Sequence, residues 1–176
     1  MKEIEVKILE IDKKEVEKKL KSLGAKKIFD GILQAHFYDF PNKSIHKAQN
    51  LFRLRKENNK VFLTYKEFIT KNKVKIFEEH EVEVSNFITT HNMLLALGLN
   101  KKRETKKHRR SYILNGAHIE IETYQEKNSN IPPFLEIEAH NLKAIYSIAK
   151  KMGYTTTDCK PWGFGELEKY YRTRKS

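Results

Sequence analysis

Alternation between apolar and charged residues is the strongest pattern in the chain. In residues 3–7, Glu3, Glu5 and Lys7 alternate with aliphatic side chains. Because successive side chains of a β-strand point to opposite faces, such a stretch predicts a strand with one apolar row and one charged row. The same reasoning predicts strands at residues 3–7, 32–40, 51–56, 61–66, 74–84, 104–114, 118–123 and 134–138.

Helical spacing of apolar residues separates groups of these strands. Asp12 is a suitable N-cap, apolar residues recur after it at intervals of four and three, and Gly24 ends the pattern. Asn86 begins a second such segment, which Gly98 closes. We expect helices at residues 13–23, 87–97, 142–152 and 165–172, polar loops at 43–50 and 125–133, and a hairpin turn at Asn115-Gly116.

The charged rows are of two kinds. Carboxylates two residues apart occur at Glu3/Glu5, Glu79/Glu81 and Glu136/Glu138, and bases two residues apart at Arg53/Arg55 and Lys107/Arg109. These rows could face water on a sheet whose apolar side lies under the helices. Alternatively, about eight strands could close into a barrel and turn the charged rows inward. Since burying unpaired ions is costly, an inward arrangement predicts a polyanion held by the bases and a divalent metal held by the carboxylates.

The length and charge of the chain indicate the number of domains and the kind of partner. The 176 residues suffice for one domain with a substantial core. The formal net charge of +12 favours an anionic partner, such as a nucleotide, polyphosphate, nucleic acid or acidic lipid, without choosing among them. The chain shows neither a signal-peptide pattern nor an apolar run long enough to span a membrane. Because Cys159 is the single cysteine, no intrachain disulfide can form, and we expect a cytoplasmic protein.

Six short motifs follow one another in the order typical of one family. The first, EIEVK at residues 3–7, resembles the ExExK signature of the CYTH superfamily, the triphosphate tunnel metalloenzymes. The others are LFRLR at 51–55, LTYK at 63–66, EHEVE at 79–83, KHR at 107–109 and FLEIE at 134–138, similar to the family's LRLR, LTxK, ExExE, KxR and (F/Y)LExE motifs. The likeness spans residues 1 to about 172. Members of this family include class IV adenylyl cyclases, thiamine triphosphatases and inorganic triphosphatases.

The resemblance implies an α+β fold, with a single domain over residues 1–176. An eight-stranded antiparallel β tunnel, a closed or nearly closed barrel, would have its helices packed outside and bind a triphosphate along its axis. The resemblance assigns catalysis to Glu3, Glu5 and Lys7, and substrate binding to Lys7, Arg53, Arg55, Lys66, Lys107 and Arg109. It assigns Mg²⁺ or Mn²⁺ binding to Glu3, Glu5, Glu136, Glu138 and Glu122, and tunnel lining to Glu79, Glu81 and His36.

Two of these positions depart from the family pattern. Glu122 stands where relatives commonly have an aspartate, so its carboxylate is one methylene further from the backbone. His36 stands where relatives often have aspartate or tyrosine. A histidine at this position could either move a proton or serve as a hydrogen-bonded structural side chain.

Three functions remain open at the level of the sequence. The first is a metal-dependent phosphohydrolase acting on triphosphate, ATP or thiamine triphosphate. The second is a class IV-type adenylyl cyclase, which would make cyclic AMP and pyrophosphate from ATP. The third is a non-catalytic module that binds polyphosphate or RNA. Nucleic acid is not expected, because the bases are interleaved with carboxylates, whereas a surface that follows a nucleic-acid backbone is predominantly basic. Monomer and homodimer are both open.

Overall fold

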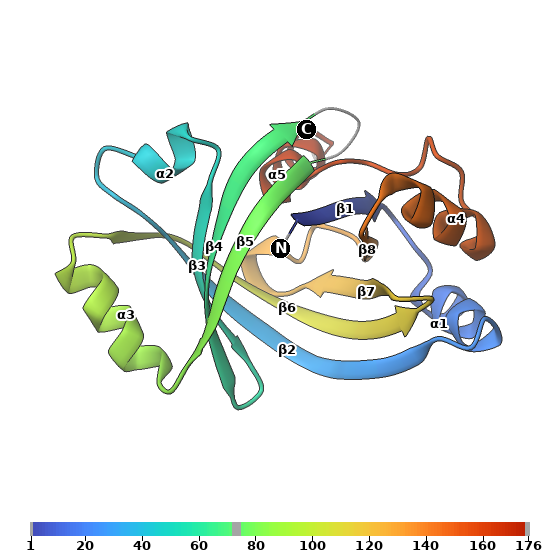
Figure 1. Ribbon diagram of the computed structural model, residues 1–176, viewed down its shortest axis with the longest axis horizontal. Helices are drawn as coiled ribbons and strands as arrows, with labels where there is room; N and C mark the ends of the chain where they lie inside the picture. The colour runs from blue at the N-terminus through green and yellow to red at the C-terminus, as the bar shows by residue number, and fades with distance from the viewer. Residues whose placement is uncertain (1, 72–74, 175–176) are drawn as a thin grey trace.

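Antiparallel strands form the body of the protein (Figure 1). The computed structural model describes residues 2–71 and 75–174, and it describes the backbone alone at residues 2, 3, 71 and 75. The strands are β1 (Lys2–Ile8), β2 (Lys26–Asp39), β3 (Leu51–Glu57), β4 (Lys60–Lys71), β5 (Lys75–Val84), β6 (Asn100–Leu114), β7 (Ala117–Tyr124) and β8 (Phe134–Ala139).

The strands close into a barrel in the order β1-β5-β4-β3-β2-β6-β7-β8. Each neighbouring pair is antiparallel, and β8 pairs back with β1 through the register Glu5↔Glu138 and Lys7↔Glu136. Closure of this kind gives each strand a partner on both sides. The predicted antiparallel tunnel is therefore confirmed.

The helices lie outside the barrel, as predicted. They are α1 (Lys13–Ser22), α2 (Ser44–Lys47), α3 (Phe87–Ala96), α4 (Leu142–Met152) and α5 (Phe164–Thr173), with a 3₁₀ turn at Glu126–Asn128. The predicted cap of α1 is present, because the side chain of Asp12 accepts hydrogen bonds from the backbone N–H groups of Lys14 and Glu15. Figure 1 shows α1 and α4 at one end of the molecule and α2 and α3 at the other.

The apolar core lies between the helices and the outer surface of the barrel. Leu20 of α1 and Ile145 of α4 are completely buried in one cluster with Ile119 and Ile137 of the barrel wall. A second cluster places Leu94 of α3 over β3, and a third places Leu167 of α5 against Phe134. Because the apolar rows of most strands face these helices, the alternating charged rows of those strands face the interior.

Three strands are clearly longer than the alternation predicts, among them β4, which runs from Lys60 to Lys71 where we expected 61–66. We expected a strand at 32–40, but β2 begins at Lys26, and β6 begins at Asn100 rather than at residue 104. Strands β2 and β6 pair from Lys26↔Ile113 to Asp39↔Asn100. Backbone hydrogen bonds between the two strands hold this ladder. The basic segment at the start of β6 therefore forms a strand although it has no alternating apolar residues.

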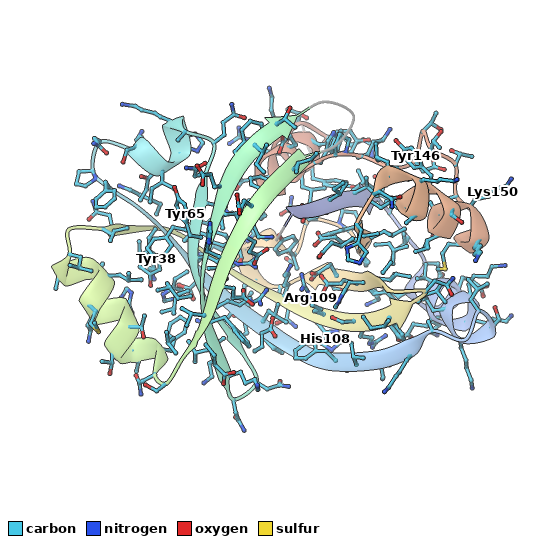
Figure 2. The ribbon with its side chains drawn as sticks, in the orientation of Figure 1. Tyr38, Tyr65, His108, Arg109, Tyr146 and Lys150 are labelled. Atoms are coloured by element: carbon cyan, nitrogen blue, oxygen red, sulfur yellow. The ribbon has the colours of Figure 1, made fainter. Side chains whose placement is uncertain are left out.

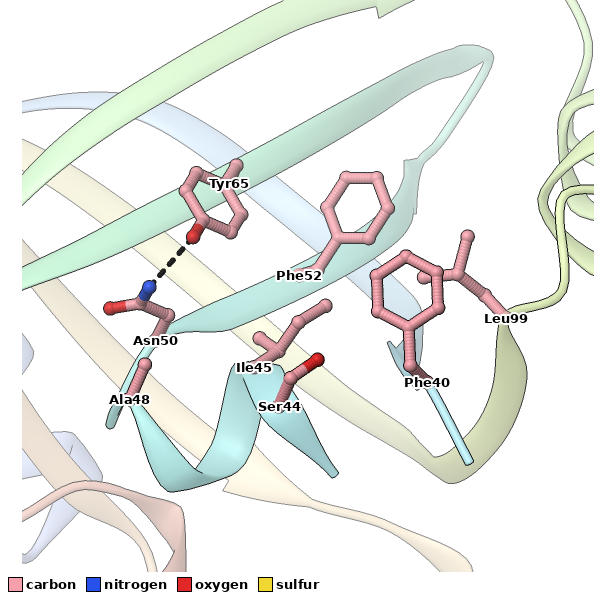
Figure 3. A pocket seen from close by; sticks show the side chains of 8 residues that line it. All are labelled: Phe40, Ser44, Ile45, Ala48, Asn50, Phe52, Tyr65 and Leu99. Carbon is pink, nitrogen blue, oxygen red and sulfur yellow. Dashed lines mark hydrogen bonds between the residues drawn. The ribbon is translucent and has the colours of Figure 1, made fainter. Parts of the chain in front are cut away.

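The segment expected to be a polar loop, residues 43–50, contains the short helix α2. Asp39 orders it, because its carboxylate accepts hydrogen bonds from the backbone N–H groups of Ile45 and His46. Asn50 donates a hydrogen bond to the Tyr65 hydroxyl at 2.6 Å. Between α2 and the outer side of the barrel lies a cavity of about 380 Å³ (Figure 3), lined by Phe40, Ser44, Ile45, Ala48, Asn50, Phe52, Tyr65 and Leu99.

Candidate active site

A cavity of about 1380 Å³ occupies the interior of the barrel and extends to the loops at its mouths. Most of the residues that the sequence motifs single out line it: Glu5, Lys7, Arg53, Arg55, Lys66, Glu79, Glu81, Lys107, Arg109, Glu136 and Glu138. They come from six different strands, so closure of the barrel is what brings them together. The backbone of Glu3 lies in β1, and its side chain lies outside the described part of the structure.

Neighbouring side chains of β6 point to opposite faces of the barrel wall, as Arg109 and His108 illustrate (Figure 2). Arg109 lines the cavity, whereas His108 lies on the outer face, where its Nε2 is 2.9 Å from a carboxylate oxygen of Asp30. This sorting follows from the period of two in an extended backbone. Consecutive basic residues of the KHRR segment therefore have different surroundings.

Two groups of ion pairs hold the bases inside the cavity. Lys7 Nζ lies 2.9 Å from Glu5 and 2.7 Å from Glu136. On the neighbouring strands β3, β4 and β5, Lys66 Nζ lies 2.7 Å from Glu79, and Arg53 Nη2 lies 3.7 Å from the same carboxylate. Each base is thus held in place by carboxylates before any anion binds, which limits the rotamer entropy lost on binding.

Arg109 is the centre of the most buried group. It forms a two-point pair with Glu120, through Nη1 at 2.7 Å and Nη2 at 2.6 Å, and its Nε donates to Glu122 Oε1 at 2.6 Å. Lys107 Nζ donates to the same Glu122 oxygen at 2.6 Å. Glu136 lies 3.9 Å from Arg109. Two bases and three carboxylates therefore share one small volume of the tunnel.

Burial and neighbouring charges shift the pKa values of these groups in opposite directions. Burial alone would lower the pKa of Lys7, but Glu136 and Glu5 outweigh it and raise that pKa well above its usual range. Burial would raise the pKa of Glu136, yet Lys7, Lys107 and Arg109 lower it strongly. The pKa of Glu120 rises to about 7, chiefly because burial disfavours its charged form.

The carboxylates of Glu120, Glu122 and Glu136 could hold a metal ion. One ligand oxygen from each lies within 4.8 Å of the others. Glu122 is 0% exposed, and its Oε2 has no hydrogen-bond partner among the described residues. An unsatisfied buried carboxylate oxygen is costly, and Mg²⁺ and Mn²⁺ both take such oxygen ligands. The residues present therefore fit a hard divalent cation.

This cluster overlaps only partly with the predicted metal site. Glu122 and Glu136 were expected, but Glu120 was not. Its position two residues before Glu122, on the same face of β7, is the signal that could have identified it. Glu5 and Glu138 line the cavity as adjacent residues in the β1–β8 register, outside the cluster of three.

The prediction that His36 lines the tunnel is wrong. Its ring lies on the outer face of the barrel under α3, with its centroid 4.8 Å from that of Phe87 and 5.3 Å from that of His91. In β2 the apolar row, which includes Leu33 and Ala35, faces the cavity, so the polar row faces outward. The alternation was recognised correctly, but it does not specify which of the two rows faces inward.

The fold and the site together define a class of protein: closed antiparallel barrels whose interior cavity is lined by acidic and basic side chains. The sequence model of the CYTH domain matches residues 1–151, and the chain belongs to this family. No curated protein sequence matches the chain. Within the described residues, the helices are too short or too polar to cross a bilayer.

Solved structures with the same fold cover nearly the whole chain. The PH1012 protein from Pyrococcus horikoshii OT3 is 27% identical, with a TM-score of 0.79 over 94% of this chain and 98% of that one. A candidate adenylate cyclase from Vibrio parahaemolyticus is 14% identical, with a TM-score of 0.78 over 95% and 97%. HpAC1, a candidate adenylyl cyclase from Hippeastrum with a dominant triphosphatase activity, is 12% identical, with a TM-score of 0.65 over 98% and 95%. At these low identities the last two support the fold alone.

Proposed function

We propose that the protein is a divalent-metal-dependent hydrolase that cleaves inorganic or organic triphosphates inside the barrel. The observation that carries this proposal is the position of Lys107 and Arg109 beside the carboxylates of Glu120, Glu122 and Glu136. Bases alone would suit any anion. Bases together with a carboxylate cluster that has an unsatisfied oxygen suit a phosphate chain that shares a metal with the protein.

The chain's own residues would act mainly by positioning. Arg53, Arg55 and Lys66 form one group of donors for phosphate oxygens, and Lys7, Lys107 and Arg109 form another. Arginine engages phosphate oxygens through two parallel N–H groups, which fixes the orientation of the phosphate as well as its place. Phosphoryl transfer depends largely on such positioning and on stabilisation of charge in the transition state.

Glu120, Glu122 and Glu136 would hold the metal, because their ligand oxygens lie close together and Glu122 Oε2 has no hydrogen-bond partner among the described residues. A bound Mg²⁺ or Mn²⁺ neutralises charge on phosphoryl oxygens and lowers the pKa of a bound water. Glu81 would help to order water in the cavity, since it already accepts a hydrogen bond from Thr64 at 2.6 Å and pairs with Arg55 at 3.2 Å.

A class IV-type adenylyl cyclase is the second candidate. Membership of the CYTH family, which includes class IV adenylyl cyclases, is the observation that favours it. Cyclisation would require the ribose 3′-hydroxyl to be aimed at the α-phosphate, whereas hydrolysis requires a water aimed at the terminal phosphate.

One experiment separates the candidates. Purified protein is given triphosphate, ATP and thiamine triphosphate in parallel, with Mg²⁺, with Mn²⁺ and with a chelator, and phosphate, pyrophosphate and cyclic AMP are measured. Metal-dependent release of phosphate supports the hydrolase. Cyclic AMP with pyrophosphate supports the cyclase. Tight binding of the substrates without turnover identifies a non-catalytic polyphosphate-binding module and overturns both.

A further inference from the structure

Arg103 is a cavity residue that none of the sequence motifs contains. It lies on β6 in the same inward-facing row as Lys107 and Arg109, and it lines the same cavity. It lies four positions before Lys107, which corresponds to about 13 Å along an extended strand. The sequence does not identify it as a cavity residue, because it stands in the basic run KKRETKK. Charge alone does not distinguish the inward-facing residues of that run from the outward-facing ones.

Two aromatic rings hold the guanidinium of Arg103 in place. Its Cζ lies 4.0 Å from the ring centroid of Phe37, its register partner on β2, and 4.2 Å from that of Phe164 at the start of α5. The ring of Phe164 in turn contacts Tyr124, with centroids 5.3 Å apart. Such cation–π contacts leave the N–H groups of a guanidinium available in its plane. Arg103 is therefore oriented without the use of its hydrogen-bond donors.

Among the described residues Arg103 forms no ion pair with a carboxylate, and Glu168 of α5, whose charge raises the pKa of Arg103, acts from beyond ion-pair distance. Within the described residues, no carboxylate oxygen lies within 4.0 Å of it, and its Nε is buried without a hydrogen-bond partner. By contrast, the six bases of the predicted site are all ion-paired: Lys7, Arg53, Arg55, Lys66, Lys107 and Arg109. Burial lowers the pKa of Arg103, but an arginine stays charged at neutral pH. An anionic group would satisfy donors that the protein leaves unsatisfied.

We propose that Arg103 forms an additional anion subsite, so that the tunnel binds linear inorganic polyphosphates longer than triphosphate. This inference rests on the proposed function, in which Lys107 and Arg109 hold phosphates near the carboxylate cluster. Arg103 takes a phosphate further along the chain, beyond the end of a triphosphate held at those two bases.

Two features favour phosphate over an organic ring at this subsite. The guanidinium covers one face each of Phe37 and Phe164, which removes these faces as stacking surfaces for a nucleobase or a thiazole ring. The wall that α5 adds to the cavity includes Lys169, a second base, while the carboxylate there, Glu166, accepts a hydrogen bond from the backbone N–H of Gly163 at 3.0 Å. The cavity of about 1380 Å³ also exceeds the usual volume of sites for single small molecules.

The test compares chain lengths in binding and in turnover. Wild type, Arg103→Ala, Arg103→Gln and the control Lys106→Ala are titrated calorimetrically, in the presence of a chelator, with triphosphate, ATP and linear polyphosphates of increasing length. Lys106 is a suitable control because it lies on the same strand, on the outer face, paired with Glu126 at 2.8 Å. Hydrolysis of the same compounds is then measured with Mg²⁺.

Loss of Arg103 should weaken binding of the longer polyphosphates about tenfold to hundredfold and leave triphosphate binding nearly unchanged. Lys106→Ala should change neither. Equal weakening for all chain lengths, no weakening at all, or weakening for ATP alone would each overturn the subsite. The proposed function fails separately, if the wild type does not hydrolyse triphosphate. Agreement between the Ala and Gln variants excludes an effect of truncation on folding, which circular dichroism also monitors.

Discussion

Arg109 donates a hydrogen bond from Nε to Glu122 Oε1 at 2.6 Å inside the barrel, while Glu122 Oε2 has no partner among the described residues. One carboxylate oxygen thus orients the base that would bind phosphate, and the other is left for a cation. A single buried side chain links the two parts of the proposed site, so its replacement should affect metal binding and stability in ways that can be measured separately.

Glu122→Gln should lower the affinity for Mn²⁺ at least about tenfold, because an amide supplies a weaker and neutral ligand in place of a carboxylate. Calorimetric titration of Mn²⁺ into the purified protein measures this directly, without substrate. Glu126→Gln is a matched control, since Glu126 is an exposed carboxylate paired with Lys106. An unchanged Mn²⁺ affinity in Glu122→Gln would exclude this residue from the metal site.

The same substitution should destabilise the fold. Glu122 is the anionic partner of both Lys107 and Arg109, and breaking a buried pair by neutralising one member costs about 3–5 kcal/mol. Urea unfolding of the metal-free protein should show this loss, whereas Glu83→Gln should cost less than about 1 kcal/mol, because Glu83 pairs with Lys60 at the surface. Similar midpoints for the two variants would contradict the buried network.

Metal binding should in turn stabilise the folded protein. A cation that binds the Glu120, Glu122 and Glu136 cluster only in the native state adds about 2.7 kcal/mol at a concentration of one hundred times its Kd. Thermal unfolding with and without Mn²⁺ should therefore show a higher Tm with the metal, and the shift should disappear in Glu136→Gln. An equal shift in this variant would place the cation elsewhere.

Much of the barrel could be predicted from the sequence, because period-two alternation is a direct consequence of strand geometry. The inward position of Arg53, Lys66 and Arg109 followed from the motifs that contain them. What alternation does not supply is the choice between the two faces. In β2 the apolar row faces the tunnel, so His36 lies outside.

Contacts between segments that are distant in the sequence could not be predicted from local sequence patterns either. Arg103 becomes distinctive only because Phe164, which begins α5, closes over it from the other side. Glu120 becomes a candidate ligand only because β8 brings Glu136 beside it in the barrel. Residue type and spacing predict which side chains share a face of one strand, whereas the partners across the tunnel depend on closure.

Two substitutions should separate substrate binding from turnover. Arg53→Ala should raise KM for triphosphate about tenfold to hundredfold, because it removes a charged donor for phosphate, with a smaller effect on kcat. Glu5→Ala should instead abolish most of the turnover, because Glu5 positions Lys7, whose Nζ lies 2.9 Å away. Steady-state kinetics with Mg²⁺ measures both, with the surface variant Lys60→Ala as the control. Activity near that of the wild type in both variants would rule out the proposed site.

The position of His36 has a consequence for stability. Its ring is buried under α3, and its Nε2 lies 3.5 Å from Glu104. Burial lowers the pKa of His36, and so does the nearby positive charge of Lys101, while Glu104 opposes the shift. Next to it, the hydroxyl of Tyr38 and Nδ1 of His91 are 2.8 Å apart. The folded protein therefore favours the neutral imidazole of His36.

Because its folded pKa lies below the unfolded value of about 6.5, protonation of His36 favours the unfolded state. The free energy of unfolding should stay level above that pH and fall as the pH decreases through it. Thermal unfolding between pH 8 and pH 5 should show a smaller decrease in Tm for His36→Gln than for the wild type. His80→Gln, in which an exposed histidine is replaced, should follow the wild type. A decrease in Tm that is the same in all three proteins would show that His36 does not cause the pH dependence.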